Sequence, residues 1–136
     1  MFLGEYQINF SGKGRVILPK KLRGQLQGNG LVLSRGFEGC VLGFDKSMWD
    51  KEAEKQLDVA LTEERGRVLR RYFFSASEFV DLDYQGRFVI PGNLLRYAQL
   101  SKEIILIGAG DHFEIWDKAS WGQHIKKIEE GYARVS

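Results

Sequence analysis

The sequence contains two copies of one short motif, and this repeat constrains the fold more than any other feature. Residues 14–19 read GRVILP, and residues 86–91 read GRFVIP. The same spacing, without a gap, also aligns Trp49 with Trp121. Glycine, proline and tryptophan fix backbone geometry or anchor packing, so their agreement carries structural information. We infer that the chain is a tandem duplication.

Each copy is expected to contain short strands around one short helix, because apolar and polar residues alternate between turns rich in glycine. The strands of the first copy are expected at residues 6–10, 15–18, 31–34 and 40–44, with a helix from Pro19 to about Leu26. Those of the second copy are expected at residues 78–82, 87–90, 103–107 and 112–116, with a helix beginning at Pro91.

A further helical segment is expected after each copy. After the first copy two helices are expected. Asp45 or Ser47 is expected to cap the first of them, and the second is expected to begin at Thr62. Ser120 is expected to cap the C-terminal helix. The predicted domains are a first repeat at 1–46, a helical connector at 47–76, a second repeat at 77–119 and a C-terminal helix at 120–136.

Neither copy is large enough to fold alone, because a few short strands and one short helix bury too little apolar surface. The two copies can complete each other's sheets. We therefore predict a mostly β fold with short helices, of the α+β class, in which the repeats form an intrachain pseudo-dimer around one shared core.

Composition argues against a membrane or secreted protein. The longest apolar run, residues 104–107, is far shorter than the roughly 20 residues that a membrane helix needs. The N-terminus has no basic and apolar signal segment, and the single cysteine, Cys40, cannot form an internal disulfide. These features predict a cytoplasmic protein.

The repeated motif has the chemistry of a nucleic-acid contact. A glycine-rich turn lets the backbone approach a phosphate, and Arg15 and Arg87 each begin a strand from which a long side chain extends. The guanidinium group can bind a phosphate or the O6 and N7 edge of guanine. Lys13 adds a charge beside Arg15, and the equivalent residue, Gln85, offers an amide. The alternative role for both arginines is an ion pair with a carboxylate such as Asp83.

Residues 13–19, KGRVILP, and residues 83–91, DYQGRFVIP, resemble the two motifs of the MraZ family. The opening MFLG and the run FEIWD at 113–117 are also similar to it, so the resemblance covers essentially the whole chain. It implies two tandem AbrB-like swapped-hairpin β-barrel repeats. It also implies a nucleoid-associated transcription regulator that acts at the promoter of its own division and cell-wall gene cluster, as a ring-shaped homo-oligomer.

In this family an aspartate stands four residues before the arginine of each motif. The second copy has this pair, Asp83 and Arg87, whereas Ser11 precedes Arg15. A serine can accept a hydrogen bond without charge assistance, so the two turns are not expected to be equivalent.

The residues and the resemblance together predict a surface for double-stranded promoter DNA. The expected DNA-binding residues are Lys13, Arg15, Lys20, Lys21, Gln85 and Arg87, and the residues expected to orient the motif are Ser11, Gly14, Asp83 and Gly86. Positive charge is concentrated in residues 1–46, where Arg23 adds to the lysines, although the net charge is only +2. The first copy is therefore expected to supply more of the electrostatic affinity, and a solvated charged surface is the alternative.

A ring would make head-to-tail contacts, which favour direct repeats in the DNA. The expected subunit seam is the helix at residues 62–74. Its basic residues favour intramolecular pairing or a subunit contact over DNA, and they are Arg65, Arg67, Arg70 and Arg71. The three tryptophans are expected to pack rather than stack on bases, His112 to lie at the surface or rim, and Cys40 to fill the core.

No catalytic or metal-binding constellation is recognisable, so neither an enzyme nor a cofactor, metal or small-molecule substrate is expected. The alternative function is a protein-interaction module of the same fold, as in antitoxins that bind a partner protein. An antitoxin is expected to carry one DNA-binding motif and a disordered tail. Here the motif occurs twice, and only a few residues follow Tyr132.

Overall fold

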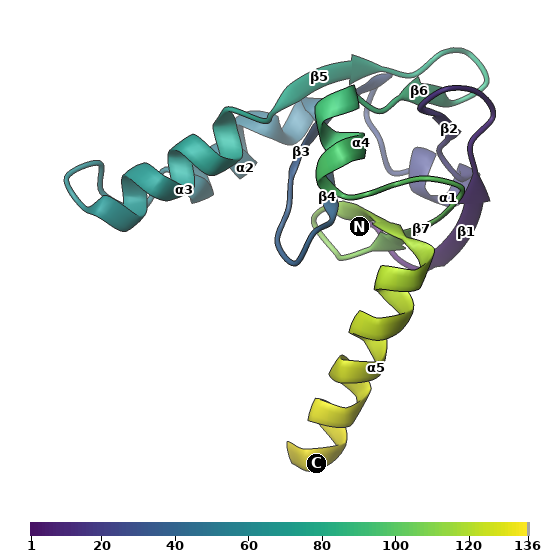
Figure 1. Cartoon of the computed structure of the whole chain (residues 1–136). Coiled ribbons are helices and arrows are strands. Elements are labelled where there is room, and N and C mark those ends of the chain that lie inside the picture. Colours follow the sequence, from purple (N-terminus) through teal and green to yellow (C-terminus); the bar gives the residue numbers. More distant parts are fainter. Residues whose placement is uncertain (136) are drawn as a thin grey trace.

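A six-stranded antiparallel sheet and a separate two-stranded ribbon form the body of the chain in a computed structural model, which describes residues 1–135 (Figure 1). The strands of the first repeat are β1 (Glu5–Asn9), β2 (Arg15–Ile17), β3 (Gly30–Arg35) and β4 (Val41–Asp45). Those of the second repeat are β5 (Glu78–Asp81), β6 (Arg87–Val89), β7 (Glu103–Gly108) and β8 (Phe113–Asp117). Every expected strand is present, within two residues of the predicted ends.

The two repeats exchange their first hairpins. The strand order of the sheet is β1-β7-β8-β4-β3-β5, so β1 of the first repeat pairs with β7 of the second, and β5 of the second pairs with β3 of the first. The centre is the pair β4 and β8, and the ribbon joins β2 to β6. This arrangement has the pseudo-two-fold symmetry of a dimer within one chain, which confirms the predicted intrachain pseudo-dimer with swapped hairpins.

The predicted closed barrel is not found. Within residues 1–135 the large sheet ends at β1 and β5, which have no second ladder partner. The strands that would continue from these edges, β2 and β6, pair with each other instead. Turn bonds rather than a ladder tie each ribbon strand to the segment before it, from Ser11 N to Arg15 O and from Asp83 N to Arg87 O, both 2.9 Å. The ribbon therefore folds over the sheet as a separate layer.

The core lies on both faces of the sheet. Between sheet and ribbon, Val16 and Phe88 of the ribbon are buried in one cluster with Leu33, Leu106 and Ile115 of the sheet. On the other face, the helices that follow each repeat cover a second cluster rich in aromatic side chains, with Phe44, Phe73, Trp116 and Trp121. All five residues of β4 are buried, because both faces of this central strand are covered.

The short helices begin one residue later than predicted. They are α1 (Lys20–Arg23) and α4 (Gly92–Tyr97). Pro19 and Pro91 are their N-cap residues, with nearly identical backbone angles (φ −54° and ψ 143° or 144°), rather than their first helical residues. The first helix ends at Arg23, three residues before the predicted end, and Gly24 is its C-cap residue.

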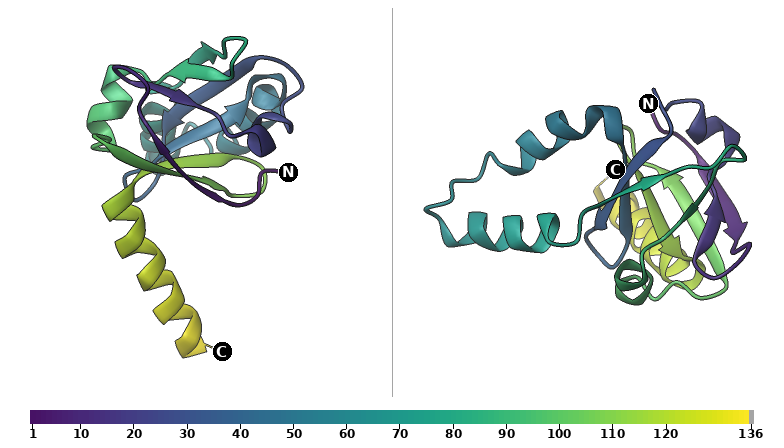
Figure 2. Two further views of the ribbon diagram at one scale, coloured as in Figure 1. Left: turned by 90° about the vertical axis from the view of Figure 1, so that its right-hand side faces the viewer. Right: turned by 90° about the horizontal axis from the view of Figure 1, so that it is seen from above.

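A helical hairpin projects from the side of the sheet (Figures 1 and 2). It contains a 3₁₀ turn (Lys46–Met48), α2 (Trp49–Gln56) and α3 (Glu64–Phe74). Asp45 caps the 3₁₀ turn, since its Oδ1 accepts a bond from Ser47 N at 3.1 Å. The second helix begins at Glu64, two residues after the predicted Thr62.

The last helix, α5 (Lys118–Val135), extends away from the body (Figure 2). It begins before Ser120, so the predicted cap is wrong. Asp117 takes that role, because its Oδ2 accepts a bond from Ser120 N at 3.3 Å. The predicted C-terminal segment 120–136 ends with residue 136, which lies outside the described residues.

Candidate nucleic-acid interface

The ribbon of β2 and β6 presents one buried and one exposed face. In its register Arg15 pairs with Val89, Val16 with Phe88 and Ile17 with Arg87. Side chains alternate across a strand, so Val16 and Phe88 face the core while the other four side chains lie on the outer face. Ile17 and Val89 are 44% and 49% exposed there. The outer face thus carries two arginines and two exposed aliphatic side chains on a rigid support.

The turns that lead into the ribbon are held by the opposite repeat. Gly14 and Gly86 have φ of 71° and 82°, the left-handed region that glycine favours. Gly86 O accepts a bond from Leu18 N, and Gly14 O accepts one from Ile90 N, both at 2.8 Å. Each turn is therefore fixed by a strand end from the other copy.

Asp83 organises the second turn. Its Oδ1 accepts bonds from Gln85 N and Arg87 N at 2.9 Å, and its Oδ2 accepts one from Arg87 Nε at 2.8 Å. The bond from the Arg87 backbone, followed by the other donors, lowers the pKa of Asp83 below its usual value. The carboxylate orients the guanidinium group and leaves both terminal nitrogens of Arg87 to donate elsewhere.

The first turn has no equivalent. Ser11 Oγ donates a long bond of 3.4 Å to Arg15 O and makes no bond to the guanidinium group. Among the described residues no carboxylate lies within ion-pair distance of Arg15. The ion-pair alternative therefore applies to Arg87 and not to Arg15, and the cause is the serine at position 11.

The other predicted DNA-binding residues lie around these turns. Lys13 and Gln85 are exposed at equivalent places in the first and second turns, and Lys20 and Lys21 are exposed on α1. None of the three lysines forms an ion pair within the described part of the chain. The structure therefore leaves these cations available to an anionic partner.

Three residues at this surface were not predicted. Ile17 and Val89 lie beside the arginines, and Tyr84, 91% exposed, stands at the tip of the second turn. The exposure of Ile17 and Val89 depends on how β2 and β6 pair, which a single sequence does not reveal. The position of Arg23 also differs from expectation. It lies against Gly86 of the second turn, although it belongs to the first repeat.

The remaining basic residues have local partners. Arg65 pairs with Glu63 at 2.9 Å, and Arg67 donates to Leu61 O and Thr62 O. Arg70 donates to the carbonyl groups of Leu57 and Val59, which closes the loop between α2 and α3. Most of this basic run serves the hairpin itself, as the favoured interpretation predicted.

Trp49, Trp116 and Trp121 pack in the aromatic cluster, as expected. Cys40 is buried, and burial raises the pKa of its thiol, which fits a core residue.

His112 is expected at the surface or rim, and in the structure both of its ring nitrogens contact carboxylate groups. Its Nδ1 lies 2.7 Å from Asp111 Oδ1, and its Nε2 lies 2.9 Å from Glu114 Oε2. Although partial burial opposes the charge, the bonds to Glu114 and Asp111 outweigh it and raise the pKa of His112. This cluster belongs to the packing of β8 and contains no free base.

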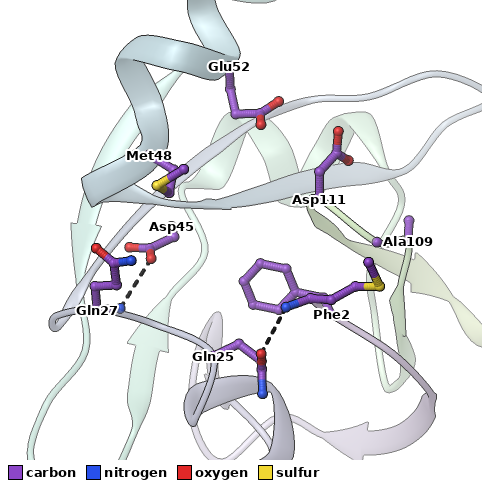
Figure 3. Close-up of a pocket in the computed structure, with 10 residues that line it drawn as sticks. Phe2, Gln25, Gln27, Asp45, Met48, Glu52, Ala109 and Asp111 are labelled. Carbon is purple, nitrogen blue, oxygen red and sulfur yellow. Dashed lines mark hydrogen bonds between the residues drawn. The ribbon is translucent and has the colours of Figure 1, made fainter.

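A hollow of about 590 Å³ lies beside α1, lined by residues of the N-terminus, α2 and the β7–β8 loop (Figure 3). Three of its lining residues are acidic, namely Asp45, Glu52 and Asp111. Asp45 is occupied by a bond from Gln27 N at 3.1 Å. Glu52 and Asp111 both pair with Lys55, and none of the residues expected to bind DNA lines the hollow, so it does not extend the candidate interface. No group of side chains suited to a metal ion, and no helix long and apolar enough to cross a membrane, is found within residues 1–135.

Comparison with known proteins gives one consistent result. The sequence model of the MraZ protein family, also described as antitoxin-like, matches residues 1–71 and 73–135. A protein of Halothermothrix orenii named transcriptional regulator MraZ is 37% identical over 136 residues, all of this chain and 94% of the relative. The protein of the same name from Lactobacillus delbrueckii subsp. bulgaricus is 38% identical over the same length and coverage.

Proposed function

The chain belongs to the MraZ family and is a DNA-binding transcriptional regulator, and we propose that it contacts DNA through the outer face of the β2–β6 ribbon. The observation that carries this proposal is that Arg15 and Arg87 lie on the same exposed face of the ribbon, Arg15 opposite Val89 and Arg87 opposite Ile17. A two-stranded ribbon fits the width of the major groove, and several DNA-binding proteins use one in this way.

The two arginines are suited to different contacts. Arg15 and Lys13 have no ion-pair partner in the described residues, so they are available to neutralise phosphates. Arg87 is oriented through Nε by Asp83, which leaves its terminal nitrogens to donate to an acceptor pair such as guanine O6 and N7. The first turn therefore supplies affinity, and the second supplies sequence readout.

The aliphatic side chains beside the arginines add a second kind of readout. Ile17 and Val89 are about half exposed on the outer face, where they would meet the base edges. Aliphatic groups contact the thymine methyl group favourably in the major groove. Tyr84, at the tip of the second turn, has a hydroxyl group that can donate to a phosphate beside the groove.

The chain is further proposed to act at the promoter of its own division and cell-wall gene cluster, on the nucleoid, as a ring of identical subunits on direct repeats. The hairpin of α2 and α3 supports the ring, because it projects from the body and exposes Leu61 and Val68 (59% and 55%). Beside Val68 lies a mainly apolar groove of about 560 Å³, lined in part by Phe37, Leu69 and Tyr72. This surface is the proposed subunit seam, and the function needs no reaction and no cofactor.

The decisive test is direct binding. A labelled duplex from the region upstream of this gene is titrated with purified protein, and a shuffled duplex of equal length is titrated in parallel. Tighter binding to the upstream duplex is expected. Equal binding to the two would contradict sequence-specific regulation at that promoter. No binding to either would turn attention to the protein-interaction alternative.

A further inference from the structure

Arg23 lies across the turn of the repeat to which it does not belong. It is the last residue of α1, in the first repeat, and its Nη1 occupies the place where a Cβ on Gly86 would stand. Its Cζ and Cδ are 2.8 Å and 3.0 Å from that place. The side chain is therefore laid along the backbone of the second turn, which is possible because Gly86 has no side chain.

The pseudo-symmetry supplies an internal comparison. Leu95 of α4 holds the position equivalent to Arg23, and its Cδ1 lies 3.1 Å from the place where a Cβ on Gly14 would stand. Each short helix thus covers the turn of the opposite repeat, with an arginine on one turn and a leucine on the other. Leu95 shows that a leucine is enough to cover such a turn by packing. The positive charge of Arg23 is therefore not needed for packing at the second turn.

Charge is the property that the second turn lacks. Arg87 is paired with Asp83, whereas Lys13 and Arg15 of the first turn have no carboxylate partner in the described residues. Within residues 1–135, Arg23 also forms no ion pair. The charges of Arg87 and Asp83 cancel, so Arg23 is the cation that makes the second turn positive, as Lys13 and Arg15 make the first turn positive.

The surroundings of Arg23 are those of an anion contact. Arg23 lines a surface groove of about 540 Å³ together with Lys20, Ile17 and Gln85. Glu5 is the acidic residue in that lining, and its Oε1 accepts a bond from Trp121 Nε1 at 2.8 Å. The amine of Lys20, the amide of Gln85 and the guanidinium group of Arg23 can all donate to one phosphate.

We propose that Arg23 binds a DNA phosphate at the second turn, so that this half of the interface is assembled from both repeats. The inference rests on the proposed function and goes beyond it. It adds Arg23 to Lys20 and Lys21 as a contact from α1, and it places this contact at the turn of the second repeat rather than at the turn of its own repeat. Guanidinium groups bind phosphate with paired donors, which suits a contact that positions Arg87 over the bases.

The test uses the substitution that the chain itself provides, Arg23→Leu. Affinity for the upstream duplex and for its shuffled control is measured between 50 and 200 mM salt. The slope of log K against log salt is expected to become less steep by about 0.9 for each phosphate that a bound subunit no longer neutralises. Because a phosphate contact carries no sequence information, affinity is expected to fall equally for both duplexes. Arg23→Lys, which keeps the charge, is expected to retain the slope.

Two controls separate this role from others. Lys127→Leu removes one positive charge from the exposed far half of α5, and it is expected to leave the slope unchanged. Circular dichroism and the melting temperature show whether Arg23→Leu remains folded, as the leucine at the equivalent position leads us to expect. Should it unfold, Arg23→Gln replaces it in the same titration.

The outcomes are distinct. If the wild-type protein binds neither duplex, the proposed function itself fails. If the wild type binds with a steep salt dependence and folded Arg23→Leu keeps the same slope, Arg23 does not bind phosphate and the inference is overturned. An equal change of slope in Lys127→Leu would also overturn it, because the effect would then follow from net charge alone.

Discussion

The Asp83 carboxylate accepts two hydrogen bonds from Arg87, one from its backbone N–H at 2.9 Å and one from its Nε at 2.8 Å. Asp83 therefore fixes both the backbone of the turn at Arg87 and the direction of the Arg87 side chain. In the first turn the Ser11 side chain makes only a bond to the Arg15 carbonyl group and makes no bond to the Arg15 guanidinium group. The difference between Ser11 and Asp83 therefore leaves Arg15 without an ion pair and gives Arg87 a fixed orientation.

Alanine at the two arginines is expected to give two different defects. Arg15→Ala removes a phosphate contact, so it weakens binding on all sequences and makes the salt slope less steep by about 0.9. Arg87→Ala removes a base contact, so it costs about 1–3 kcal/mol on the operator and relaxes specificity at one position. At low salt Arg15 is expected to matter more, because Lys13, Lys20 and Lys21 lie near it in sequence.

These two variants are compared by fluorescence anisotropy on operator and shuffled duplexes. Far-UV circular dichroism and melting temperature are expected to stay close to the wild type for Arg15→Ala, which breaks no bond of the guanidinium group. A large drop in the melting temperature of Arg15→Ala would assign this residue to the fold rather than to DNA.

Ser11→Asp is expected to convert the first turn into a copy of the second. The new carboxylate stands four residues before Arg15, as Asp83 does before Arg87. It would accept bonds from the turn and from Arg15 Nε, so the turn becomes more rigid and Arg15 is no longer a free cation. The expected result is a less steep salt slope with a higher melting temperature. An unchanged slope would show that Arg15 does not need to be unpaired.

The sequence predicts the architecture well because the information is local or repeated. The match of GRVILP with GRFVIP locates β2, β6 and the two short helices, and the alternation along 112–116 locates β8 to within one residue. Pairing between distant segments is different. No local signal shows that α1 crosses to the second turn, so the sequence assigns Arg23 to the charge of its own repeat, whereas the side chain lies on Gly86.

The same limit explains the other differences. The resemblance implies a closed barrel, but β2 pairs with β6 and the large sheet stays open. Serine is a common N-cap, so the sequence favours Ser120 as the cap of α5, yet Asp117 is equally suitable and lies closer to the strand. The two carboxylate partners of His112 are near it in sequence, but their geometry depends on the β7–β8 turn, which the sequence does not define.

Stability is expected to fall as pH rises through the titration of His112. The folded state raises the pKa of His112 above 6.5, its value in an unperturbed side chain. The stabilisation that the imidazolium group gains from Asp111 and Glu114 is therefore fully present below about 6.5 and disappears as pH rises through the higher folded-state pKa. The melting temperature of the wild type is expected to decline over that window.

His112→Gln is the matched variant, because glutamine keeps hydrogen-bonding groups but does not titrate. It is expected to melt at a lower temperature than the wild type near pH 6 and to show no decline across the same window. Parallel curves for the two proteins would place the pH dependence elsewhere. DNA binding is expected to be unaffected by the variant, since the cluster lies on β8 and its preceding loop rather than on the ribbon.

Val68→Glu is expected to break the proposed subunit seam without unfolding the chain. Val68 is 55% exposed on α3, so a charge there costs little in the isolated subunit but is unfavourable in an apolar contact. Light scattering is expected to show smaller particles for Val68→Glu, while Val68→Thr, similar in shape, keeps the wild-type mass. A monomeric wild-type protein at working concentration would contradict the ring itself.

The spacing of the operator tests how the subunits bind together. Each ribbon offers only a few cations, and so small a patch gives weak, largely sequence-independent binding by itself. Identical subunits in a cyclic assembly repeat head to tail, so they present their Arg15 turns in one direction and favour direct repeats over palindromes. Sites on one side of the duplex recur about every 10 base pairs. Linking such sites raises the apparent affinity through effective concentration, without any new contact.

Inserting about five base pairs between two repeats turns one of them to the opposite side of the duplex. The apparent affinity is expected to fall toward that of a single repeat, because one assembly can no longer engage both sites. Inserting about ten base pairs restores the facing and is expected to restore most of the affinity, which separates the effect of rotation from that of length. Undiminished affinity after the shorter insertion would show that the subunits bind independently, and the ring would then have no part in reading the operator.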